Sequence, residues 1–373
     1  MKKLLMVVNE DRFFLSHRKD IALKAQAEGF DVKIVCKDTG RSEELYALGL
    51  SMIELPINPT GTNLREEFAT MFFLLKLYRS EQPDIVHHVG LKNILWGGIA
   101  AKLAKVKGVV NAVCGLGVLF AGEQPSFMAR AIMRVMAVAN RGMNVSEIFQ
   151  NRDDMQLFIS HGVVKPSQCD FIKGSGVDLD MFSNVSKHSD GKIRVIFTAR
   201  MVKEKGVMTL IEAAKKLRAE FGDSAEFLLC GDLSSNPDGI KKEDLEACCD
   251  ESYIQWLGYR SDVKQLLQSS HIMAFPSYYR EGLPLSLIEA CAVGLPIVTC
   301  DSIGCRDAVD DGVNGFLVPP RDSDALADKL KVLFLNKSLR EAMGKKGREK
   351  AENEFALQAV VDKHLAIYRK LIV

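Results

Sequence analysis

Residues 275–296 read FPSYYREGLPLSLIEACAVGLP, and this stretch holds the change from strand to turn to helix that decides the fold. An apolar run ends at Pro276, the turn residues Gly282 and Pro284 follow, and a helical pattern begins near Leu285. Backbone N–H groups therefore gather at a helix N-terminus directly after a strand, which favours negatively charged ligands. The stretch predicts one strand–helix unit of an α/β sheet with an anion-binding end.

The same alternation of short apolar runs and helical stretches continues on both sides of this unit. The runs that fit strands cover residues 4–8, 31–36, 51–55, 85–88, 109–113 and 170–173 in the first half, and 194–199, 225–230, 253–257, 271–275, 296–299 and 315–318 in the second. Short buried runs joined by helices are typical of parallel sheets covered on both faces. The fold class is therefore α/β.

Length and composition indicate two domains in this chain. Its 373 residues exceed the roughly 250–300 at which one core stops growing, and a Gly- and Ser-rich stretch at residues 173–191 interrupts the strand–helix rhythm. We expect two Rossmann-like domains facing each other across a cleft. The expected boundaries are an N-terminal domain at residues 1–185, a C-terminal domain at 186–354, and a final helix at 355–373 that packs back on the N-terminal domain.

Charge and cysteine content exclude several classes of protein. The chain has 49 Lys and Arg against 48 Asp and Glu, so charge gives no reason to expect nucleic acid as a partner. Nine cysteines without a C-x-x-C pair suit neither a disulfide framework nor a zinc site, and they indicate reduced thiols in a cytoplasm. No apolar run approaches the ~20 residues that span a bilayer, so membrane contact would be peripheral.

Two carboxylates in the opening stretch are candidate ligand-binding groups. Glu289 lies on the first turns of the predicted helix, where a carboxylate can accept two hydrogen bonds from the vicinal hydroxyls of a ribose. Glu281, on the turn itself, can accept from a sugar hydroxyl. The alternative is that both are ordinary surface acids.

A second cluster, TARMVKEKGV, places two cations after a predicted strand. Arg200 ends the strand, and Lys205 precedes a glycine and a helix. Both side chains would emerge at the carboxyl end of the sheet, where they can neutralise a departing diphosphate. A charged surface loop without function is the competing interpretation.

These motifs resemble glycosyltransferase family four. PSYYREGLP, TARMVKEKGV, GSGVDLDMF and GCRDAVDDGVNGFLVPP follow the family's order and spacing over essentially the whole C-terminal half. The resemblance implies the GT-B fold, transfer with retention, and neither metal nor cofactor. It assigns the ribose to Glu289, the donor sugar to Glu281, and the diphosphate to Arg200 and Lys205.

The remaining donor-binding candidates surround these residues. Loop residues after two further strands are placed to wall the nucleotide base, with Tyr259 or Arg260 stacking on it, although an exposed pair on a loop is the commoner case. The donor-binding candidates besides Glu289 are Gly282, Leu283, Pro284, Leu285, Gly231, Tyr259 and Arg260.

The N-terminal half resembles bacterial transferases that extend lipid-linked oligosaccharides for capsule, O-antigen or glycoprotein assembly. FFLSHRKDIALKAQAEGFDVKIV and DIVHHVGLKNILWGGIAAKLAKVKGVVNAVCGLG carry this similarity, which implies that this half receives the acceptor. A helix opening near Arg18 would catch a lipid diphosphate, and two glycines would either admit the substrate to the backbone or form a structural turn. The acceptor-binding candidates are Ser16, His17, Arg18, His87, Lys92, Gly115 and Gly117.

The histidine pattern departs from the broader family. That family often carries His-x-His after this strand, whereas this chain has His87-His88-Val89. Neighbouring side chains of a strand point to opposite faces, so only one histidine can face the cleft. We take His88 as the catalytic histidine, beside Arg200, Lys205 and Glu281 as the other catalytic candidates, and a hydrogen-bonded structural role remains the alternative for each histidine.

Two further patterns have ambiguous interpretations. Asp178-Leu179-Asp180 looks like a D-x-D metal site, but it lies in the linker, so we interpret it as structural. The stretches at residues 64–79 and 127–141 are apolar with interspersed Arg and Lys, which suits either core helices or a seat on an anionic bilayer, with the inner membrane as a peripheral partner.

The sequence therefore predicts transfer of a hexosyl or N-acetylhexosaminyl group from a UDP-sugar to a lipid-linked glycan acceptor. The protein would work in the cytoplasm, at the membrane face, in surface polysaccharide or glycoprotein assembly. A nucleotide-sugar epimerase of the same fold and a non-catalytic nucleotide-sugar-binding subunit are the alternatives. A nicotinamide-dependent dehydrogenase is disfavoured because no G-x-G-x-x-G follows the first strand.

Overall fold

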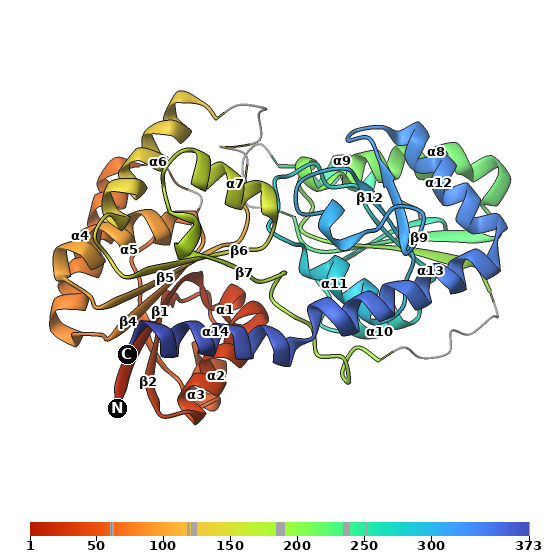
Figure 1. The fold of residues 1–373 in the computed structure, drawn as a ribbon. Coiled ribbons are helices and arrows are strands. Elements are labelled where there is room, and N and C mark those ends of the chain that lie inside the picture. Colours follow the sequence, from red (N-terminus) through yellow and green to blue (C-terminus); the bar gives the residue numbers. More distant parts are fainter. Residues whose placement is uncertain are drawn as a thin grey trace. The chain divides into compact units, whose positions relative to one another are not determined.

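The chain forms two compact α/β units (Figure 1). The computed structural model describes residues 1–59, 61, 63–117, 120, 125–183, 191–233, 239–250 and 252–372. Unit 1 comprises residues 1–176 and 358–373, and unit 2 comprises residues 177–357. The units thus divide at Gly176, earlier than the residue 185 expected from the linker composition, and residues 184–190 of that linker lie outside the described residues.

Unit 1 is built on a parallel sheet of seven strands in the order β3-β2-β1-β4-β5-β6-β7. Its strands are β1 (Lys2–Glu10), β2 (Phe30–Lys37), β3 (Ser51–Glu54), β4 (Ile85–Val89), β5 (Gly108–Val113), β6 (Val145–Phe149) and β7 (Cys169–Phe171). The strand order reverses between β1 and β4, which creates a topological switch point at their carboxyl ends. The sequence did not predict β6, because the buried residues of this strand include the polar Ser146 and Glu147.

Helices cover both faces of this sheet. In Figure 1, α4, α5 and α6 lie together on one face, and α1, α2 and α14 lie on the other. The helices of unit 1 are α1 (Asp11–His17), α2 (Lys19–Ala27), α3 (Ser42–Ala47), α4 (Leu64–Glu81), α5 (Leu91–Ala104), α6 (Phe127–Asn140), α7 (Arg152–Ser160), the 3-10 turn η2 (Pro166–Gln168) and α14 (Leu357–Leu371). The last helix of the chain therefore completes the unit that contains its first strand.

Unit 2 repeats the same topology with six parallel strands in the order β10-β9-β8-β11-β12-β13. Its strands are β8 (Ile193–Thr198), β9 (Ala225–Cys230), β10 (Ile254–Gly258), β11 (Ile272–Phe275), β12 (Ile297–Cys300) and β13 (Gly315–Val318). Its helices are η3 (Lys203–Lys205), α8 (Val207–Phe221), α9 (Lys242–Glu246), α10 (Val263–Gln268), α11 (Leu285–Ala292), η4 (Arg306–Ala308), α12 (Ser323–Leu335), α13 (Lys337–Lys350) and the π-turn η5 (Ala351–Phe355). The switch point here lies between β8 and β11.

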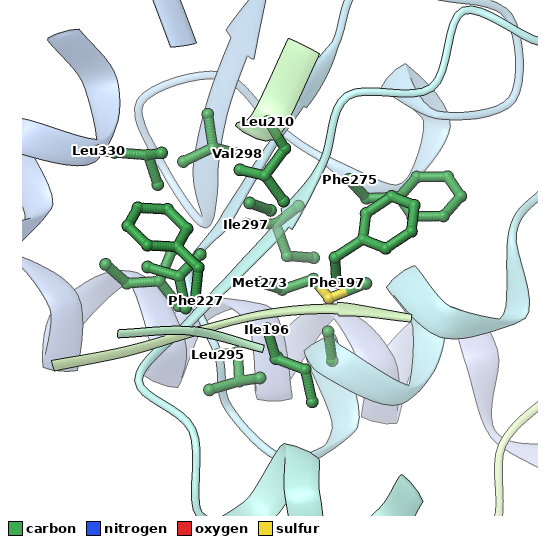
Figure 2. Packing of buried hydrophobic residues seen from close by; sticks show 14 of the residues in the cluster. Ile196, Phe197, Leu210, Phe227, Met273, Phe275, Leu295, Ile297, Val298 and Leu330 are labelled. Atoms are coloured by element: carbon green, nitrogen blue, oxygen red, sulfur yellow. The ribbon is translucent and has the colours of Figure 1, made fainter. Parts of the chain in front are cut away.

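The core of unit 2 is formed by side chains of the sheet and of the helices that cover it (Figure 2). Phe197 and Phe275, from the two strands beside the switch point, stack with ring centroids 5.8 Å apart. Such aromatic pairs add stability beyond the area that they bury. The strands that carry the candidate site are thus held by fully buried rings directly beneath their carboxyl ends.

A row of hydrogen-bonded polar side chains crosses the core of unit 1. His88, Asn111 and Glu147 occupy the same register position on β4, β5 and β6. Asn111 Oδ1 lies 2.8 Å from His88 Nδ1, and Asn111 Nδ2 donates to Glu147 Oε2 at 2.9 Å. Tyr78 of α4 closes the row, with its hydroxyl 3.0 Å from His88 Nε2. The four side chains therefore form one continuous polar chain under α4 and α5.

The histidine and the glutamate of this row are neutral near pH 7. Burial lowers the pKa of His88 to about 4, against the opposing effect of the Asn111 hydrogen bond. Burial also raises the pKa of Glu147 to about 8. Since Asn111 Oδ1 can only accept, His88 Nδ1 carries the proton and Nε2 accepts from Tyr78. A neutral row avoids the large cost of placing an unpaired charge in the core.

We expect Gly97→Ala to destabilise unit 1 by about 1–3 kcal/mol, because an overpacked core must shift its side chains. A Cβ at Gly97 of α5 would lie 2.4 Å from His88 Nε2, and His88 cannot retreat while both ring nitrogens are hydrogen-bonded. Urea unfolding measures the change. Gly98→Ala is the matched control, since its Cβ would meet only the Ala139 side chain at 3.7 Å. Equal stability of the two variants would contradict this account of the row.

Candidate active site

The candidate site of unit 2 lies at the switch point, where β8 and β11 end. Lys205 of η3 and Glu281 of the loop after β11 form an ion pair, with side chains 16% and 12% exposed. Ser277 Oγ donates to the same Glu281 oxygen at 3.1 Å. The structure thus brings two of the residues predicted as catalytic into direct contact at the edge where α/β sheets bind ligands.

Aromatic rings hold the Lys205 ammonium in place. Its Nζ lies 5.5 Å from the ring centre of Phe275 and 5.4 Å from that of Tyr279, within the range of cation–π attraction. Tyr278 and Tyr279 donate their backbone N–H groups to the carbonyl of Glu204, so the loop after β11 is fastened to η3. The lysine is therefore positioned before any ligand binds.

Two glycines allow the loops around this pair to approach each other. Gly206 has φ +78°, and a Cβ there would lie 2.0 Å from the carbonyl oxygen of Pro276. Gly304, in the loop after β12, has φ +86°, and its Cβ would lie 2.5 Å from the carbonyl oxygen of Gly282. A side chain at either position would separate the loops that hold Lys205 and Glu281.

The predicted helix N-terminus is present as α11. No side chain among the described residues caps its first turn, so its leading N–H groups are available to an anion. Gly282, Leu283 and Pro284 are buried before it, and Leu285 is its first residue, partly exposed. The helix begins where the sequence predicted.

Glu289 of α11 carries a carboxyl group that no described residue pairs or hydrogen-bonds. The residue retains partial exposure to solvent, yet burial raises its pKa to about 8. A confined carboxyl group without a partner is suited to bind a donor of hydrogen bonds. This placement leaves Glu289 available for the ribose role implied by the resemblance.

The other donor-site candidates lie at neighbouring strand ends of unit 2. Arg200 is exposed beyond β8, and it acts electrostatically on Tyr279. Gly231 follows β9 with φ +146°, and a Cβ there would overlap the carbonyl oxygen of Ala199. Tyr259 is 65% exposed, whereas Arg260 is engaged by Asp262 at 2.6 Å. Stacking on a base therefore falls to Tyr259, which is exposed, more readily than to Arg260.

In unit 1, the candidates Arg18 and His87 belong to one buried polar cluster. Arg18 is 1% exposed and donates to Ser175 Oγ at 3.2 Å and to Cys114 Sγ at 3.0 Å. Among the described residues no carboxylate pairs with it, and its Nε has no partner. His87 Nδ1 lies 2.6 Å from the hydroxyl of Tyr368 in α14. The sequence did not indicate that the last helix takes part in this cluster.

Three acceptor-site candidates lie elsewhere than the sequence predicted or are already engaged. The first helix begins at Asp11, so Ser16 and His17 end it rather than open it, and a helix C-terminus does not attract anions. Arg18 lies at the junction between α1 and α2. Lys92, on the first turn of α5, binds Glu67 Oε1 at 2.6 Å and the carbonyl of Asn58 at 2.8 Å.

The predicted glycine turn after β5 is described only in part. Gly115 has φ +97° and Gly117 has φ +63°, conformations that favour glycine, and Phe120 N donates to the carbonyl of Gly117 at 3.2 Å. Residues 118–119 and 121–124 lie outside the described residues.

His88 does not join the other catalytic candidates. It is fully buried, and both ring nitrogens are used by Tyr78 and Asn111 in the polar row. A histidine with no free nitrogen and a pKa near 4 cannot accept a proton from a substrate at neutral pH. The structure gives it the structural role that the sequence left as the alternative.

Some residues of both clusters escaped sequence analysis. In unit 2 the residues that were not predicted are Ser277, Tyr279 and Gly304. Of these, only Tyr279 had a signal in the sequence, namely the pair of tyrosines in PSYYREG. In unit 1 they are Cys114, Ser175, His364 and Tyr368, whose distance along the chain from Arg18 leaves no local signal. By contrast, Asp178 is structural as expected, because its Oδ1 accepts from the N–H groups of Asp180 at 3.0 Å and of Met181 at 2.8 Å.

No helix within the described ranges combines the length and the hydrophobicity that a bilayer span requires.

Two family profiles match the two halves of the chain. The profile described as "Glycosyl transferase 4-like" matches residues 3–144, and the profile "Glycosyl transferases group 1" matches residues 180–350. The second match contains Arg200, Lys205, Glu281 and Glu289, the residues that line the candidate site of unit 2.

Curated relatives align over nearly the full length. The chain is 26% identical over 355 residues to N,N'-diacetylbacillosaminyl-diphospho-undecaprenol alpha-1,3-N-acetylgalactosaminyltransferase of Campylobacter jejuni, covering 92% of each chain. It is 26% identical over 360 residues to UDP-Gal:alpha-D-GlcNAc-diphosphoundecaprenol alpha-1,3-galactosyltransferase of Escherichia coli, covering 93% of this chain and 90% of the relative.

Solved structures share the fold. HepE of Anabaena in complex with UDP and glucose superposes with a TM-score of 0.80 at 17% identity, covering 99% of this chain and 100% of that chain. Sucrose-phosphate synthase of Thermosynechococcus elongatus superposes with a TM-score of 0.81 at 18% identity, covering 100% and 99%. Glycosyltransferase profiles match both halves of the chain, and solved glycosyltransferases share its fold. The chain therefore belongs to glycosyltransferase family four, which has the GT-B fold.

Proposed function

We propose that the protein transfers a hexosyl or N-acetylhexosaminyl group from a UDP-sugar to a lipid-linked glycan acceptor, with retention at the anomeric carbon and without a metal or cofactor. One observation carries the proposal. The Lys205–Glu281 pair lies at the switch point of unit 2, beside the uncapped N-terminus of α11 and the unpartnered carboxyl group of Glu289. This set offers a cation, a helix end and a diol acceptor, which are the groups that a nucleotide sugar needs.

Each part of the donor would meet a different element. The diphosphate is held by Lys205, by the exposed Arg200 and by the N–H groups of α11, which together stabilise the charge that develops as the sugar departs. Glu281 draws Lys205 into position and accepts from a sugar hydroxyl. Glu289 accepts from the ribose hydroxyls. The acceptor hydroxyl attacks the anomeric carbon on the same face from which the diphosphate departs. A diphosphate oxygen takes the proton of that hydroxyl.

Support for an alpha linkage comes from the relatives. The names of the two full-length relatives specify alpha-1,3 transfer to diphospho-undecaprenol-linked sugars. Common UDP-hexoses carry the nucleotide in the alpha position, so an alpha product requires retention. On the same ground we propose unit 1 as the acceptor half, and the cytoplasmic face of the inner membrane as the place of reaction.

The proposal is tested by binding and hydrolysis of a panel of UDP-sugars in the presence of a chelator. We expect one UDP-sugar to bind and to be hydrolysed slowly to UDP and free sugar without acceptor. Release of an epimerised nucleotide sugar would instead show an epimerase. Binding without any turnover, also when a diphospholipid-linked sugar is supplied, would show a binding subunit.

Donor affinity should depend on the ionisation of Glu289. Ribose hydroxyls donate to the carboxylate, so binding requires loss of the proton that the free protein holds up to about pH 8. We expect the affinity for a UDP-sugar to rise by up to about tenfold per pH unit from pH 6 to pH 8, and to level off above. Isothermal titration calorimetry measures the trend.

Glu289→Gln is the matched variant for this measurement. Its amide keeps the shape of the protonated acid but cannot ionise, so its affinity should be low and independent of pH. Glu212→Gln, on the covering helix α8, is the control and should leave the slope of wild type unchanged. A pH slope that survives in Glu289→Gln would exclude Glu289 as the titrating group.

A further inference from the structure

The outer surface of helix α6 in unit 1 combines large apolar side chains with arginine. Phe127 is 77% exposed, Met128 61% and Val138 62%. Arg130 and Arg134 are exposed beside them, and residues 127–141 contain no acidic residue. Isolated exposed apolar residues are common, but a helix that exposes several of them in succession marks a surface that binds something.

The two kinds of side chain are sorted along α6. At 3.6 residues per turn, Arg130, Arg134 and Arg141 fall on one edge of the exposed surface. Phe127 and Val138 fall beside them, toward the other edge. The opposite side of the helix is buried through Ala129, Met133, Met136 and Ala139. The helix therefore has a core side and, facing outward, an apolar strip bordered by guanidinium groups.

Helix α4, on the same face of the sheet, repeats this composition. Phe68 is 46% exposed and Phe72 60%, next to the exposed Lys76 and Arg79. A shallow hollow of about 490 Å³ is lined by Phe72, Leu75, Lys76, Arg79 and Ser80.

The acidic residues of α4 are paired or hydrogen-bonded with other residues of unit 1. Glu67 binds Lys92 at 2.6 Å, and Glu81 binds Lys33 at 2.7 Å. Glu66, at the start of the helix, accepts from Asn58 at 3.1 Å. The outward surface that remains is basic and apolar, although the whole chain has a net charge of only +1.

We infer that the exposed side chains of α4 and α6, called here the α4–α6 face, dock unit 1 on the surface of an anionic phospholipid bilayer. The apolar side chains enter the boundary between headgroups and acyl chains, and the arginines and lysines meet the lipid phosphates. A single-sign basic border is complementary to such a surface, whereas contact with a second copy of this face would oppose like charges.

The position of this face within unit 1 fits a lipid-linked substrate. The first turns of α4 contact the first turns of α5 through Glu67, Lys92 and Trp96, at the carboxyl end of the sheet. The face therefore begins at the edge where α/β units bind ligands. Docking does not rest on turnover, because it is measured without donor or acceptor.

The test is flotation of the full chain with vesicles of phosphatidylcholine alone or mixed with phosphatidylglycerol. We expect the protein to float with the mixed vesicles only, and to detach as the salt concentration rises. Charge reversal in Arg130→Glu/Arg134→Glu should weaken partitioning at least roughly tenfold. Phe68→Ser/Phe72→Ser should weaken it as well, because the apolar contact is lost.

The matched control is Lys345→Glu/Lys346→Glu on α13 of unit 2, which changes the net charge equally and should leave binding unchanged. Unchanged thermal unfolding and UDP-sugar binding of all variants show that they are folded. The inference is overturned if wild type ignores the mixed vesicles, binds neutral vesicles equally, or loses as much binding in the α13 control. Sedimentation that shows a dimer broken by the α6 variant, without vesicle binding, would instead assign the face to a second copy.

Discussion

Replacing Lys205 with alanine is expected to lower kcat at least about 100-fold, since one preorganised charge aimed at the developing negative charge commonly contributes that much. The same change should also destabilise unit 2 by about 3 kcal/mol, because the mostly buried Glu281 loses the ammonium group that it contacts. Steady-state kinetics and urea unfolding measure the two effects separately.

A double-variant cycle separates the stabilising role of the pair from its chemical role. Lys205→Met/Glu281→Gln removes both charges, keeps similar volumes and retains an acceptor for Ser277, so it should recover most of the lost stability. Its activity should stay as low as that of Lys205→Ala. Recovery of both would show that the lysine only maintains the fold.

Lys331→Ala provides the control for removal of a lysine from an ion pair. Lys331 pairs with Glu220 on the surface, where the side chains are 42% and 51% exposed. Such pairs contribute less than about 1 kcal/mol, so neither stability nor kcat should change much. A loss as large as that of Lys205→Ala would contradict the assignment of the larger effect to burial.

Unit 1 is expected to unfold in mild acid, because it buries three neutral histidines. Burial lowers the pKa of His88 to about 4 and of His364 to about 3, and it lowers that of His87 well below its usual value. In the unfolded chain a histidine titrates near 6.5. Their contribution to stability is therefore complete above pH 6.5 and is lost as the pH falls toward the folded pKa values.

The opposing group is Glu147, whose raised pKa of about 8 favours the folded state at lower pH. Between pH 6.5 and 4.5 the contributions of His88 and His364 to stability each fall, and that of Glu147 rises, by about 1.4 kcal/mol per pH unit, while His87 acts in the same direction as the other histidines. For His88, His364 and Glu147 together the net loss over those two units is about 3 kcal/mol, to which His87 adds, and this is a large part of the total stability of many domains. Above pH 6.5 only the glutamate acts, so stability should decline by about 2 kcal/mol toward pH 8.

Urea unfolding at pH 4.5, 6.5 and 8 measures this profile. Glu147→Gln should remove the decline above pH 6.5, because the amide resembles the protonated acid and still accepts from Asn111. His364→Gln should reduce the acid slope, whereas the exposed His161→Asn should not. A stability that stays constant from pH 8 to pH 4.5 would contradict the neutral burial of these groups.

Much of the fold could be predicted because most strands are apolar runs between turn residues. The exception is β6, which shows what an apolar pattern within one segment cannot predict. Ser146 and Glu147 interrupt its apolar pattern, and their burial is tolerated only through partners on neighbouring strands and helices, such as Asn111. A pattern within one segment cannot reveal partners that lie elsewhere in the chain.

The candidate residues of unit 1 and of unit 2 differed in how well the sequence predicted their positions, and the reason is the same. Lys205, Glu281 and Glu289 follow strands within short motifs, so their spacing alone placed them at one edge of unit 2. His88 and Arg18 were harder, because which face of a strand is covered depends on helices distant in sequence. His88 is hydrogen-bonded to Tyr78, and His87 to Tyr368. Neither tyrosine lies near a recognisable motif.

The return of α14 to unit 1 has a consequence for how the protein is made. On the ribosome, most of unit 1 is synthesised before unit 2, yet the hydroxyl of Tyr368 that pairs with His87 emerges only after unit 2. Unit 2 can fold while unit 1 still exposes the surface that α14 will later cover. Unit 1 is thus started before unit 2 and completed after it, and an exchange of C-terminal halves between relatives should leave residues 358–373 with their own N-terminal half.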